Sequence, residues 1–475
     1  MPLAIPLSKT GGPLFRQVYT GLRDAILSGA FRAGDRFPST RELAEQLGIS
    51  RTAVLAAYDQ LLAEGFATGR RGSGTYVAEG LERSRPENLE KHARLRLSRF
   101  GRAAAVTPLP SERPLAGLRY DFTYRRTGVE SFPFELWRRL LLRHARKATL
   151  RSLDYGPAGG SLALREAICA HLRRSRAVIA EPSQVIVVNG SQQALDLAAR
   201  ILLERGDTVA IEDPHYQGAR KVFQAAGARL CGVPVDGEGL DPLRLPAKAR
   251  MAFVTPSHQL PTGVILPLAR RLALLEWAKR TSAVVIEDDY DGEFRYHGQP
   301  LESMQGLDTE GRVIYLGTFS RTMFPSLRIG YLIAPKSLSD AFTGAKWLAD
   351  RHTSTLEQEA LAEFIATGAY ERYLRRARRL HARRREVLLD AIHRHLADRV
   401  SVTGDASGVH IVLWPHGRAS EKAILTRAAE RNVAVYGVSG YFLKRSPQAG
   451  LLLGYSQMRE ADIREGIRRL AEAFG

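Results

Sequence analysis

Residues 35–54, DRFPSTRELAEQLGISRTAV, decide the fold of the N-terminal part of this chain. Ser39 and Glu42 have the spacing of a capping box, so a helix is predicted to begin directly after Ser39. Gly48 is predicted to end that helix, and Ser50 is predicted to cap a second one. Two short helices joined by a tight, glycine-containing turn predict a helix-turn-helix.

The sequence on both sides extends this motif. Before it, apolar residues recur with the spacing that buries one face of a helix, at Leu14, Val18, Leu22 and Ile26. After it, residues 65–78, GFATGRRGSGTYVA, predict a β-hairpin with Arg70 and Arg71 at its tip. Residues 1–80 are therefore predicted to form an α+β winged helix-turn-helix head that binds DNA. A helical domain used only for dimerisation is the alternative.

Residues 13–78 resemble the winged helix-turn-helix of GntR-type regulators, through the stretch 35–54 together with AYDQLLAEGF (57–66) and GSGTYV (72–77). The resemblance implies a double-stranded DNA operator as partner. The start of the second helix would enter the major groove, where an arginine can bond guanine twice. The implied groove and phosphate contacts are Arg41, Ser50, Arg51 and Thr52, and the implied wing residues are Arg70, Gly72, Ser73 and Thr75.

Length and composition fit a multidomain intracellular protein. The 475 residues predict two or more domains. Lysine and arginine total 69 against 50 for aspartate and glutamate, a net charge of +19 that attracts nucleic acid, although a solvated arginine-rich surface would give the same count. Two cysteines argue against a disulfide framework. With neither a signal peptide nor an apolar run long enough to span a bilayer, the chain is predicted to be cytoplasmic, with no membrane partner.

The remaining sequence predicts a linker and an α/β body. Residues 81–117 carry charges and prolines without clear periodicity, which is typical of a tether. From residue 118 onward, β-like apolar runs alternate with helical ones, which predicts a mainly parallel sheet covered by helices. The predicted sheet strands are 184–189, 208–212, 228–234, 251–255, 283–287, 312–316 and 328–333. A smaller α+β subdomain is predicted mainly within 351–475, with strands at 408–414, 432–436 and 451–455.

Six motifs in order make residues 118–475 resemble the fold-type-I aminotransferases, and specifically the MocR-type regulators that join such a body to a GntR-type head. The motifs are LDYGPAGGSLALREAI (153–168), VNGSQQALDLAARILLERGD (188–207), EDPHYQGAR (212–220), TPSHQLPTG (255–263), IEDDYDGEF (286–294) and YLGTFSRTMFPSLRIGYL (315–332). The resemblance implies a seven-stranded, mainly parallel sheet, pyridoxal 5'-phosphate as cofactor and a homodimer.

Each motif carries residues suited to that cofactor. Ser191 and Gln192 open a helix, whose free amides suit a phosphate. The ring of Tyr216 is placed to stack on a pyridine, and Asp288 matches the carboxylate that keeps the pyridine nitrogen protonated. The resemblance further implies that Tyr290 and Gln259 bond the phenolic oxygen, that Ser320 and Arg328 hold the phosphate, and that Tyr155 reaches the phosphate of the neighbouring subunit.

Two positions depart from the family. The lysine that would form the Schiff base belongs directly after Ser320, where this chain has Arg321. A guanidinium stays protonated and is a poor nucleophile, so no catalytic residue is predicted and the cofactor is expected to bind non-covalently or not at all. Aminotransferases often have a carboxylate-binding arginine where this chain has Leu452. Arg321 is either natural or a designed replacement of the lysine, and Leu452 favours the first.

Three functions compete on this evidence. The preferred prediction is a DNA-binding regulator whose body binds pyridoxal phosphate, an amino-acid-like effector or both. The alternative is a working aminotransferase with an added DNA-binding head, which Arg321 disfavours. The third is a structural DNA-binding protein whose body only dimerises. No metal site is predicted, because His258 and His297 lack a second ligand at metal-binding spacing and are interpreted as structural.

Overall fold

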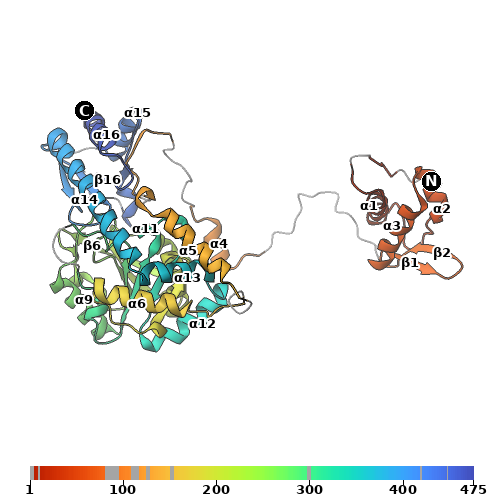
Figure 1. The fold of residues 1–475 in the computed structure, drawn as a ribbon, viewed down its shortest axis with the longest axis horizontal. Helices are drawn as coiled ribbons and strands as arrows, with labels where there is room; N and C mark the ends of the chain where they lie inside the picture. Colours follow the sequence, from red (N-terminus) through yellow and green to blue (C-terminus); the bar gives the residue numbers. More distant parts are fainter. Residues whose placement is uncertain are drawn as a thin grey trace. The chain divides into compact units, whose positions relative to one another are not determined.

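The computed structural model describes residues 5–8, 11–80, 96–108, 117–124, 129–149, 154–296, 301–417, 420–444, 446 and 448–474. Their contacts divide the chain into two units, Met1–Arg96 and Leu97–Gly475, each of which is considered by itself (Figure 1). No helix among these residues has the length and apolar character needed to cross a membrane.

The first unit is a winged helix-turn-helix head. Ser39 forms the predicted capping box with Glu42, since the Glu42 amide donates to the Ser39 hydroxyl at 3.2 Å and the Ser39 amide donates to the Glu42 carboxylate at 2.8 Å. Gly48 ends the helix in the left-handed conformation, with a φ of 65° that suits glycine, and Ser50 caps the next helix. The elements are α1 (Leu14–Leu27), α2 (Thr40–Leu47), α3 (Arg51–Ala63), β1 (Ala67–Arg70) and β2 (Gly74–Val77).

The head has its own apolar core. Val18 and Leu22 of α1, Leu43 of α2, and Val54 and Leu61 of α3 are all fully buried together. Strands β1 and β2 pair antiparallel to form the predicted hairpin. The helices and helix caps predicted from the sequence are therefore present in the structure of the head.

The second unit is built on an eight-stranded sheet in the order β4-β11-β10-β9-β8-β5-β6-β7. Strands β10, β9, β8, β5 and β6 run parallel, whereas β11 and β7 pair antiparallel with their neighbours. The bounds are β4 (Val185–Val188), β5 (Thr208–Asp213), β6 (Arg229–Asp236), β7 (Gly239–Leu240), β8 (Ala249–Val254), β9 (Val284–Asp289), β10 (Val313–Thr318) and β11 (Gly330–Ile333). The seven predicted strands are confirmed, and the two-residue β7 adds an eighth.

Helices cover both faces of this sheet. One face packs on α7 (Ser191–Leu202), α8 (Gln217–Ala226) and α12 (Ser339–Asp350). The other face packs on α5 (Phe134–Arg146), α6 (Leu162–Arg176), α9 (Leu268–Thr281), α10 (Met304–Leu307) and α13 (Thr355–Ala366). Within the predicted linker, α4 (Arg99–Ala105) contacts α8. Two covered faces explain why these strands are continuous apolar runs in the sequence.

A smaller subdomain follows at the C-terminal end. Its antiparallel sheet has the order β12-β13-β16-β15, and a separate short pair joins β14 to β3. These elements are β3 (Tyr120–Asp121), β12 (Val400–Thr403), β13 (His410–Pro415), β14 (Val433–Ala434), β15 (Tyr436–Gly437) and β16 (Leu451–Gly454), with helices α14 (Ala369–Leu396), α15 (Glu421–Glu430) and α16 (Glu460–Ala473). The predicted strand 432–436 is divided into β14 and β15, while β3 and β12 were not predicted.

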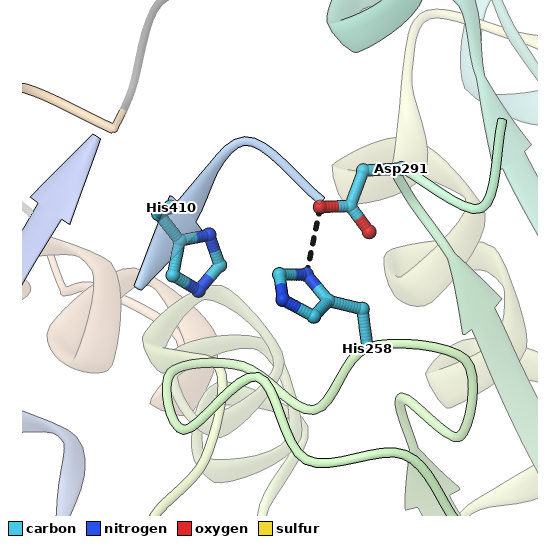
Figure 2. A group of neighbouring side chains, drawn as sticks. All are labelled: His258, Asp291 and His410. Carbon is cyan, nitrogen blue, oxygen red and sulfur yellow. Dashed lines mark hydrogen bonds and ion pairs between the residues drawn. The ribbon is translucent and has the colours of Figure 1, made fainter. Parts of the chain in front are cut away.

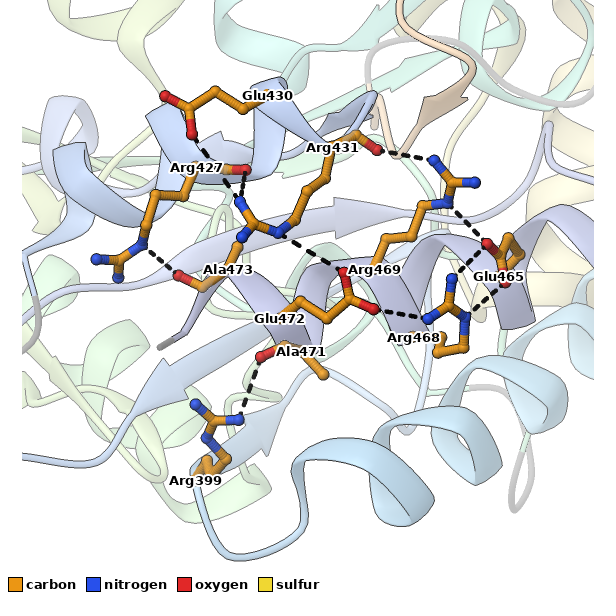
Figure 3. Close-up of polar contacts among 10 residues, drawn as sticks. All are labelled: Arg399, Arg427, Glu430, Arg431, Glu465, Arg468, Arg469, Ala471, Glu472 and Ala473. Carbon is orange, nitrogen blue, oxygen red and sulfur yellow. Dashed lines mark hydrogen bonds and ion pairs between the residues drawn. The ribbon is translucent and has the colours of Figure 1, made fainter.

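Arginines hold the C-terminal helix α16 in place (Figure 3). The guanidinium of Arg427 donates to the carbonyl of Ala473 at 2.6 Å, and that of Arg399 donates to the carbonyl of Ala471 at 3.1 Å. Arg468 pairs with Glu465 at 2.8 Å and with Glu472 at 2.6 Å. Cations at the last carbonyls of a helix complement its dipole. Part of the arginine excess of the chain therefore serves structure rather than nucleic-acid binding.

Candidate functional site

The body contains a cavity of about 630 Å3 to which the ends of strands β8, β9 and β10 contribute. Residues from five of the six predicted motifs line it, together with residues that the sequence did not single out. The predicted residues in its lining are Ser191, Gln192, Tyr216, Asp288, Tyr290, Ser320, Arg321 and Arg328. The fold therefore brings eight of the ten proposed cofactor residues to one cavity.

One end of the cavity is suited to a phosphate. Gly190 caps α7 with a φ of 87°, and Arg328 donates from Nη2 to the carbonyl of Asn189 at 2.6 Å. A side chain at Gly190 would place its Cβ 2.8 Å from Arg328 Nη2, so only glycine leaves the guanidinium in this position. The buried hydroxyl oxygen of Ser320 has no hydrogen-bond partner within the described residues. A helix N-terminus, an arginine and a free hydroxyl together form an anion-binding cradle.

Asp288 presents a carboxylate to the same cavity. It lies near the end of β9, is 4% exposed, and its Oδ1 has no hydrogen-bond partner among the described residues. Burial, together with the negative charges of Asp289 and Asp291, raises the pKa of Asp288 to about 7, and the positive charge of Arg321 opposes this shift. An unpaired buried carboxylate is costly, and a protonated ring nitrogen is a group that would pair with it.

Tyr216 forms a wall of the cavity at the start of α8. Its hydroxyl donates to Gln192 Oε1 at 3.4 Å, and Gln192 Nε2 donates to the carbonyl of Gly218 at 3.3 Å. Burial raises the pKa of Tyr216 to about 12, with a further contribution from Asp288, so its ring stays uncharged and suited to stacking.

Arg321 lies at the other end of the cavity, between two tyrosines. Its Nη1 donates to the carbonyl of Tyr124. Its guanidinium carbon is 5.6 Å from the ring centre of Tyr124 and 5.8 Å from that of Tyr290, within cation–π range of both. Helix α11 (Phe319–Thr322), which carries Arg321, directly follows β10. The position expected for a lysine is therefore occupied by a fixed cation.

Two of the predicted cofactor residues do not line the cavity. Gln259 is 1% exposed, and its Nε2 donates to the carbonyls of Pro214 at 2.7 Å and Leu260 at 2.9 Å. Its Oε1 accepts from the Thr262 amide at 3.0 Å, so both ends of its amide group are engaged within the protein. Tyr155 is 73% exposed, with the guanidinium of Arg351 4.5 Å from its ring centre. Its predicted role in a neighbouring subunit stays a prediction.

Behind Tyr290, the structure gathers His258, Asp291 and His410, all buried (Figure 2). His258 Nδ1 lies 2.9 Å from Asp291 Oδ2 and 3.1 Å from the Tyr290 hydroxyl. One ligand atom from each of the three residues lies within 4.8 Å of the others, a spacing that a metal site also has. Burial holds the pKa of His410 well below its usual range, so its ring is neutral. Through its contact with Tyr290, His258 supports a residue of the cavity lining. His297 lies outside the described residues.

The cavity also has walls from distant parts of the chain, which sequence reasoning missed. Tyr124 follows the short β3, and its hydroxyl bonds that of Tyr441. Thr107 and Pro108, just after α4, form another wall, and Lys221 Nζ donates to the Pro108 carbonyl at 2.7 Å. None of these residues belongs to a motif with a recognisable spacing, so only the tertiary structure reveals them. Two residues of the predicted linker thus line the cavity.

In the head, the predicted recognition residues lie at the starts of two helices, Arg41 in α2 and the other three at the start of α3. Arg41, Ser50, Arg51 and Thr52 are all exposed. The Ser50 hydroxyl accepts from the Ala53 amide at 3.3 Å, and Arg51 Nε donates to the Thr40 hydroxyl at 3.2 Å. The exposed guanidinium of Arg51 is therefore held beside the start of α2.

The hairpin β1–β2 carries the predicted wing residues. Arg70, Gly72 and Ser73 are exposed, and Thr75 is half-buried. The guanidinium of Arg70 lies 4.7 Å from the ring centre of Tyr76, and the hydroxyls of Tyr76 and Ser73 are 2.5 Å apart. The wing thus presents donors on a short, internally braced loop.

Comparisons with known proteins agree with this division. Residues 14–77 match the family of bacterial regulatory proteins named after GntR, and residues 128–470 match the aminotransferase class I and II family. The probable rhizopine catabolism regulatory protein MocR of Rhizobium meliloti is 41% identical over 97% of this chain and 94% of that protein. The pyridoxine biosynthesis transcriptional regulator PdxR of Corynebacterium glutamicum is 33% identical over 100% of this chain and 98% of that protein.

A solved enzyme structure matches the body. The kynurenine aminotransferase of Pyrococcus horikoshii, crystallised with PMP, has a TM-score of 0.73 and 29% sequence identity, covering 78% of this chain and 95% of that one. The body therefore has the aminotransferase fold, whereas these two relatives, which extend over the head as well, carry the names of regulators.

Proposed function

Since the chain belongs to the MocR-type regulators of the GntR family, which join a helix-turn-helix head to a class I aminotransferase domain, we propose that it is a regulator that senses a vitamin B6 phosphate. In this proposal the head binds operator DNA and the body binds pyridoxal phosphate without a covalent bond. A single observation supports this ligand. Two buried atoms of residues that line one cavity, Asp288 Oδ1 and Ser320 Oγ, have no hydrogen-bond partner among the described residues.

The proposed DNA contacts are Arg41 of α2, the exposed residues at the start of α3, and the wing. Arg51 would read a base, while Arg41, Ser50 and Thr52 would contact the groove or phosphates, as would Arg70, Gly72, Ser73 and Thr75 from the wing. In a mobility-shift assay on the operator, Arg51→Ala should weaken binding about 10- to 100-fold, which corresponds to about 1–3 kcal/mol for a bidentate base contact. Arg16→Ala, at an exposed arginine of α1, is the matched control and should lose no more than about threefold.

The cavity residues fit the proposed ligand. Its phosphate would bind at Ser191, Ser320 and Arg328, its ring would stack on Tyr216, and its nitrogen would pair with Asp288. Tyr290 would contact the phenolic oxygen. Bound pyridoxal phosphate would supply an electrophilic aldehyde and an electron-withdrawing ring, but Arg321 cannot supply the amine that transamination requires.

The rival activity is testable in the same preparation. Incubation with amino acid and keto acid should give no amino-group exchange above background, whereas addition of pyridoxal phosphate should change the absorption spectrum of the ligand. Brisk exchange would establish an enzyme, and the absence of any spectral or calorimetric response would remove pyridoxal phosphate as the ligand.

We further propose a cytoplasmic homodimer in which Tyr155 of one subunit contributes to the phosphate site of its partner. An amino-acid-like effector or the B6 phosphate itself would act by binding one arrangement of body and heads more tightly than another. Sedimentation of the full chain tests the dimer. Tyr155→Ala should weaken phosphate-ligand binding without altering the fold of the body, and unchanged affinity in a confirmed dimer would remove Tyr155 from the site.

A further inference from the structure

We propose that Arg321 makes the ring end of the cavity select the group that a B6 phosphate carries at carbon 4. A carboxylate or aldehyde there would be bound, and an ammonium group would be rejected. This inference rests on the proposed function, because it takes a B6 phosphate as the ligand. It goes beyond that function by stating which chemical form the regulator detects.

The position of Arg321 carries the first step. Two tyrosine rings flank its guanidinium, at 5.6 Å and 5.8 Å, and the carbonyl of Tyr124 fixes Nη1. Among the described residues, the hydrogen bond of the Arg321 side chain engages Nη1, and the side chain lines the cavity. A guanidinium has five N–H donors, so donors remain for a ligand. By the family resemblance, the residue at this position faces the carbon that the missing lysine would attack.

The second observation is the balance of charged side chains that line the cavity. Its described lining holds three cations, Lys221, Arg321 and Arg328, and one carboxylate, Asp288. Arg328 lies beside the phosphate cradle, and Lys221 is bonded to the Pro108 carbonyl. With Asp288 paired to the ring nitrogen, no carboxylate in the described lining remains for a second positive group on the ligand. An ammonium facing Arg321 would therefore be repelled, because arginine keeps its charge at any accessible pH.

The third observation is that Leu452 is apolar. It is fully buried in an apolar cluster with Tyr124, Tyr290 and Tyr441, at the position where related enzymes often have a carboxylate-binding arginine. A carboxylate on the ligand has no cation there to bind. Arg321 is the cation available at the ring end, and its planar fork matches a carboxylate.

The test compares three ligands that differ only at carbon 4. Pyridoxal phosphate carries an aldehyde, pyridoxamine phosphate carries an aminomethyl group that is protonated at pH 7, and 4-pyridoxic acid phosphate carries a carboxylate. Calorimetric titration of the full chain should show the amine binding roughly 10- to 100-fold more weakly than the aldehyde, the range of one hydrogen bond to a charged group. The carboxylate should bind at least as tightly as the aldehyde.

Variants identify Arg321 as the source of this preference. Arg321→Met should bring the three affinities to within about threefold of one another, and Arg321→Gln provides a second uncharged variant if the first does not fold. Arg394→Met, at an exposed arginine of α14, is the matched control and should keep the wild-type order. Arg321→Lys restores an amine that can condense with the aldehyde, losing water, so borohydride treatment should add ligand mass to residue 321 in that variant and to no lysine in the wild type.

The outcomes separate the two proposals. If all three ligands bind the wild type equally, or if the preference survives in Arg321→Met, the selectivity inference is overturned while the B6 phosphate ligand stands. If none of the three binds, the proposed ligand fails, and the inference fails with it. Ligand mass found on Lys221 of the wild type after borohydride would overturn non-covalent binding.

Discussion

Replacing Asp288 by asparagine should have two effects of opposite sign: a more stable unliganded protein and weaker binding of pyridoxal phosphate. Asp288 is buried at the end of β9, with Oδ1 unpartnered among the described residues. An ionised carboxylate in this position is destabilising, and asparagine has nearly the same shape without the charge. The same charge is what a protonated ring nitrogen would bind.

The size of the first effect follows from the pKa. The pKa of about 7 for Asp288 in the folded protein compares with 3.8 for an ordinary aspartate. Well below pH 4 the Asp288 carboxyl is neutral in both the folded and the unfolded state, so it does not lower the free energy of unfolding. As the pH rises from about 4 to about 7, the unfolded chain ionises first, so the folded state loses up to about 1.4 kcal/mol for each pH unit. Above about pH 7 the loss of folding free energy stays constant at no more than about 4 kcal/mol.

The assay is urea unfolding of the wild type and Asp288→Asn at pH 5 and pH 8, without ligand. The advantage of the variant should grow by roughly 2–3 kcal/mol between the two pH values. Glu212 and Glu287, whose pKa values burial also raises to about 7, titrate in both proteins and cancel in the difference. In parallel, the variant should bind pyridoxal phosphate about 10- to 100-fold more weakly, because it lacks a charge-assisted hydrogen bond.

Parallel pH dependence of the two proteins would refute the reasoning, since it would mean that Asp288 has an ordinary pKa in the fold. A variant that is more stable at pH 8 but binds the ligand as tightly as the wild type would keep the electrostatic argument and remove Asp288 from the ligand site.

Three further predictions test the head, the cradle and the linker. Ser39→Ala removes the hydroxyl that accepts from the Glu42 amide, so the head should lose about 1 kcal/mol and unfold at a lower temperature in calorimetry, before the body. Gly190→Ala places a Cβ 2.8 Å from Arg328 at a φ of 87°, so it should destabilise the body by about 1–3 kcal/mol in urea and weaken phosphate-ligand binding in the same titration. Lys221→Ala removes the donor to the Pro108 carbonyl, so the Thr107 amide, which bonds the Ala104 carbonyl, should exchange with deuterium roughly fivefold faster, as loss of about 1 kcal/mol implies.

Local chemistry made much of the fold predictable. The capping box at Ser39, the left-handed Gly48 and the cap at Ser50 each act within a few residues, so the helix-turn-helix can be predicted from sequence. The body strands are apolar runs because both faces of their sheet are covered, and the predicted runs coincide with observed strands. The two-residue strands β3 and β7 were missed because a segment that short has no periodicity to detect.

The cavity shows where prediction from sequence stops. Residues within the motifs, such as Asp288 and Ser320, line it because they lie at or just beyond the ends of neighbouring strands of one sheet. Tyr124, Thr107 and Lys221 lie far apart in the sequence and meet only through tertiary packing. Gln259 is in a predicted motif, yet its amide group bonds the backbone of Pro214 and Thr262 and is not part of the cavity lining.

The buried polar groups of the cavity explain how the proposed regulator, which has no amine at residue 321, would respond to a ligand. Asp288 Oδ1 and Ser320 Oγ are buried without a hydrogen-bond partner in the described part of the chain, which raises the free energy of the folded state. A ligand that paired with both groups would remove that cost in any arrangement of the body that brings the two groups together around the ligand. A difference in free energy between arrangements is what a regulator requires, and it needs no bond-making step. Thr107 and Pro108 of the predicted linker form part of the cavity wall, so in the proposed function a bound ligand would contact that segment.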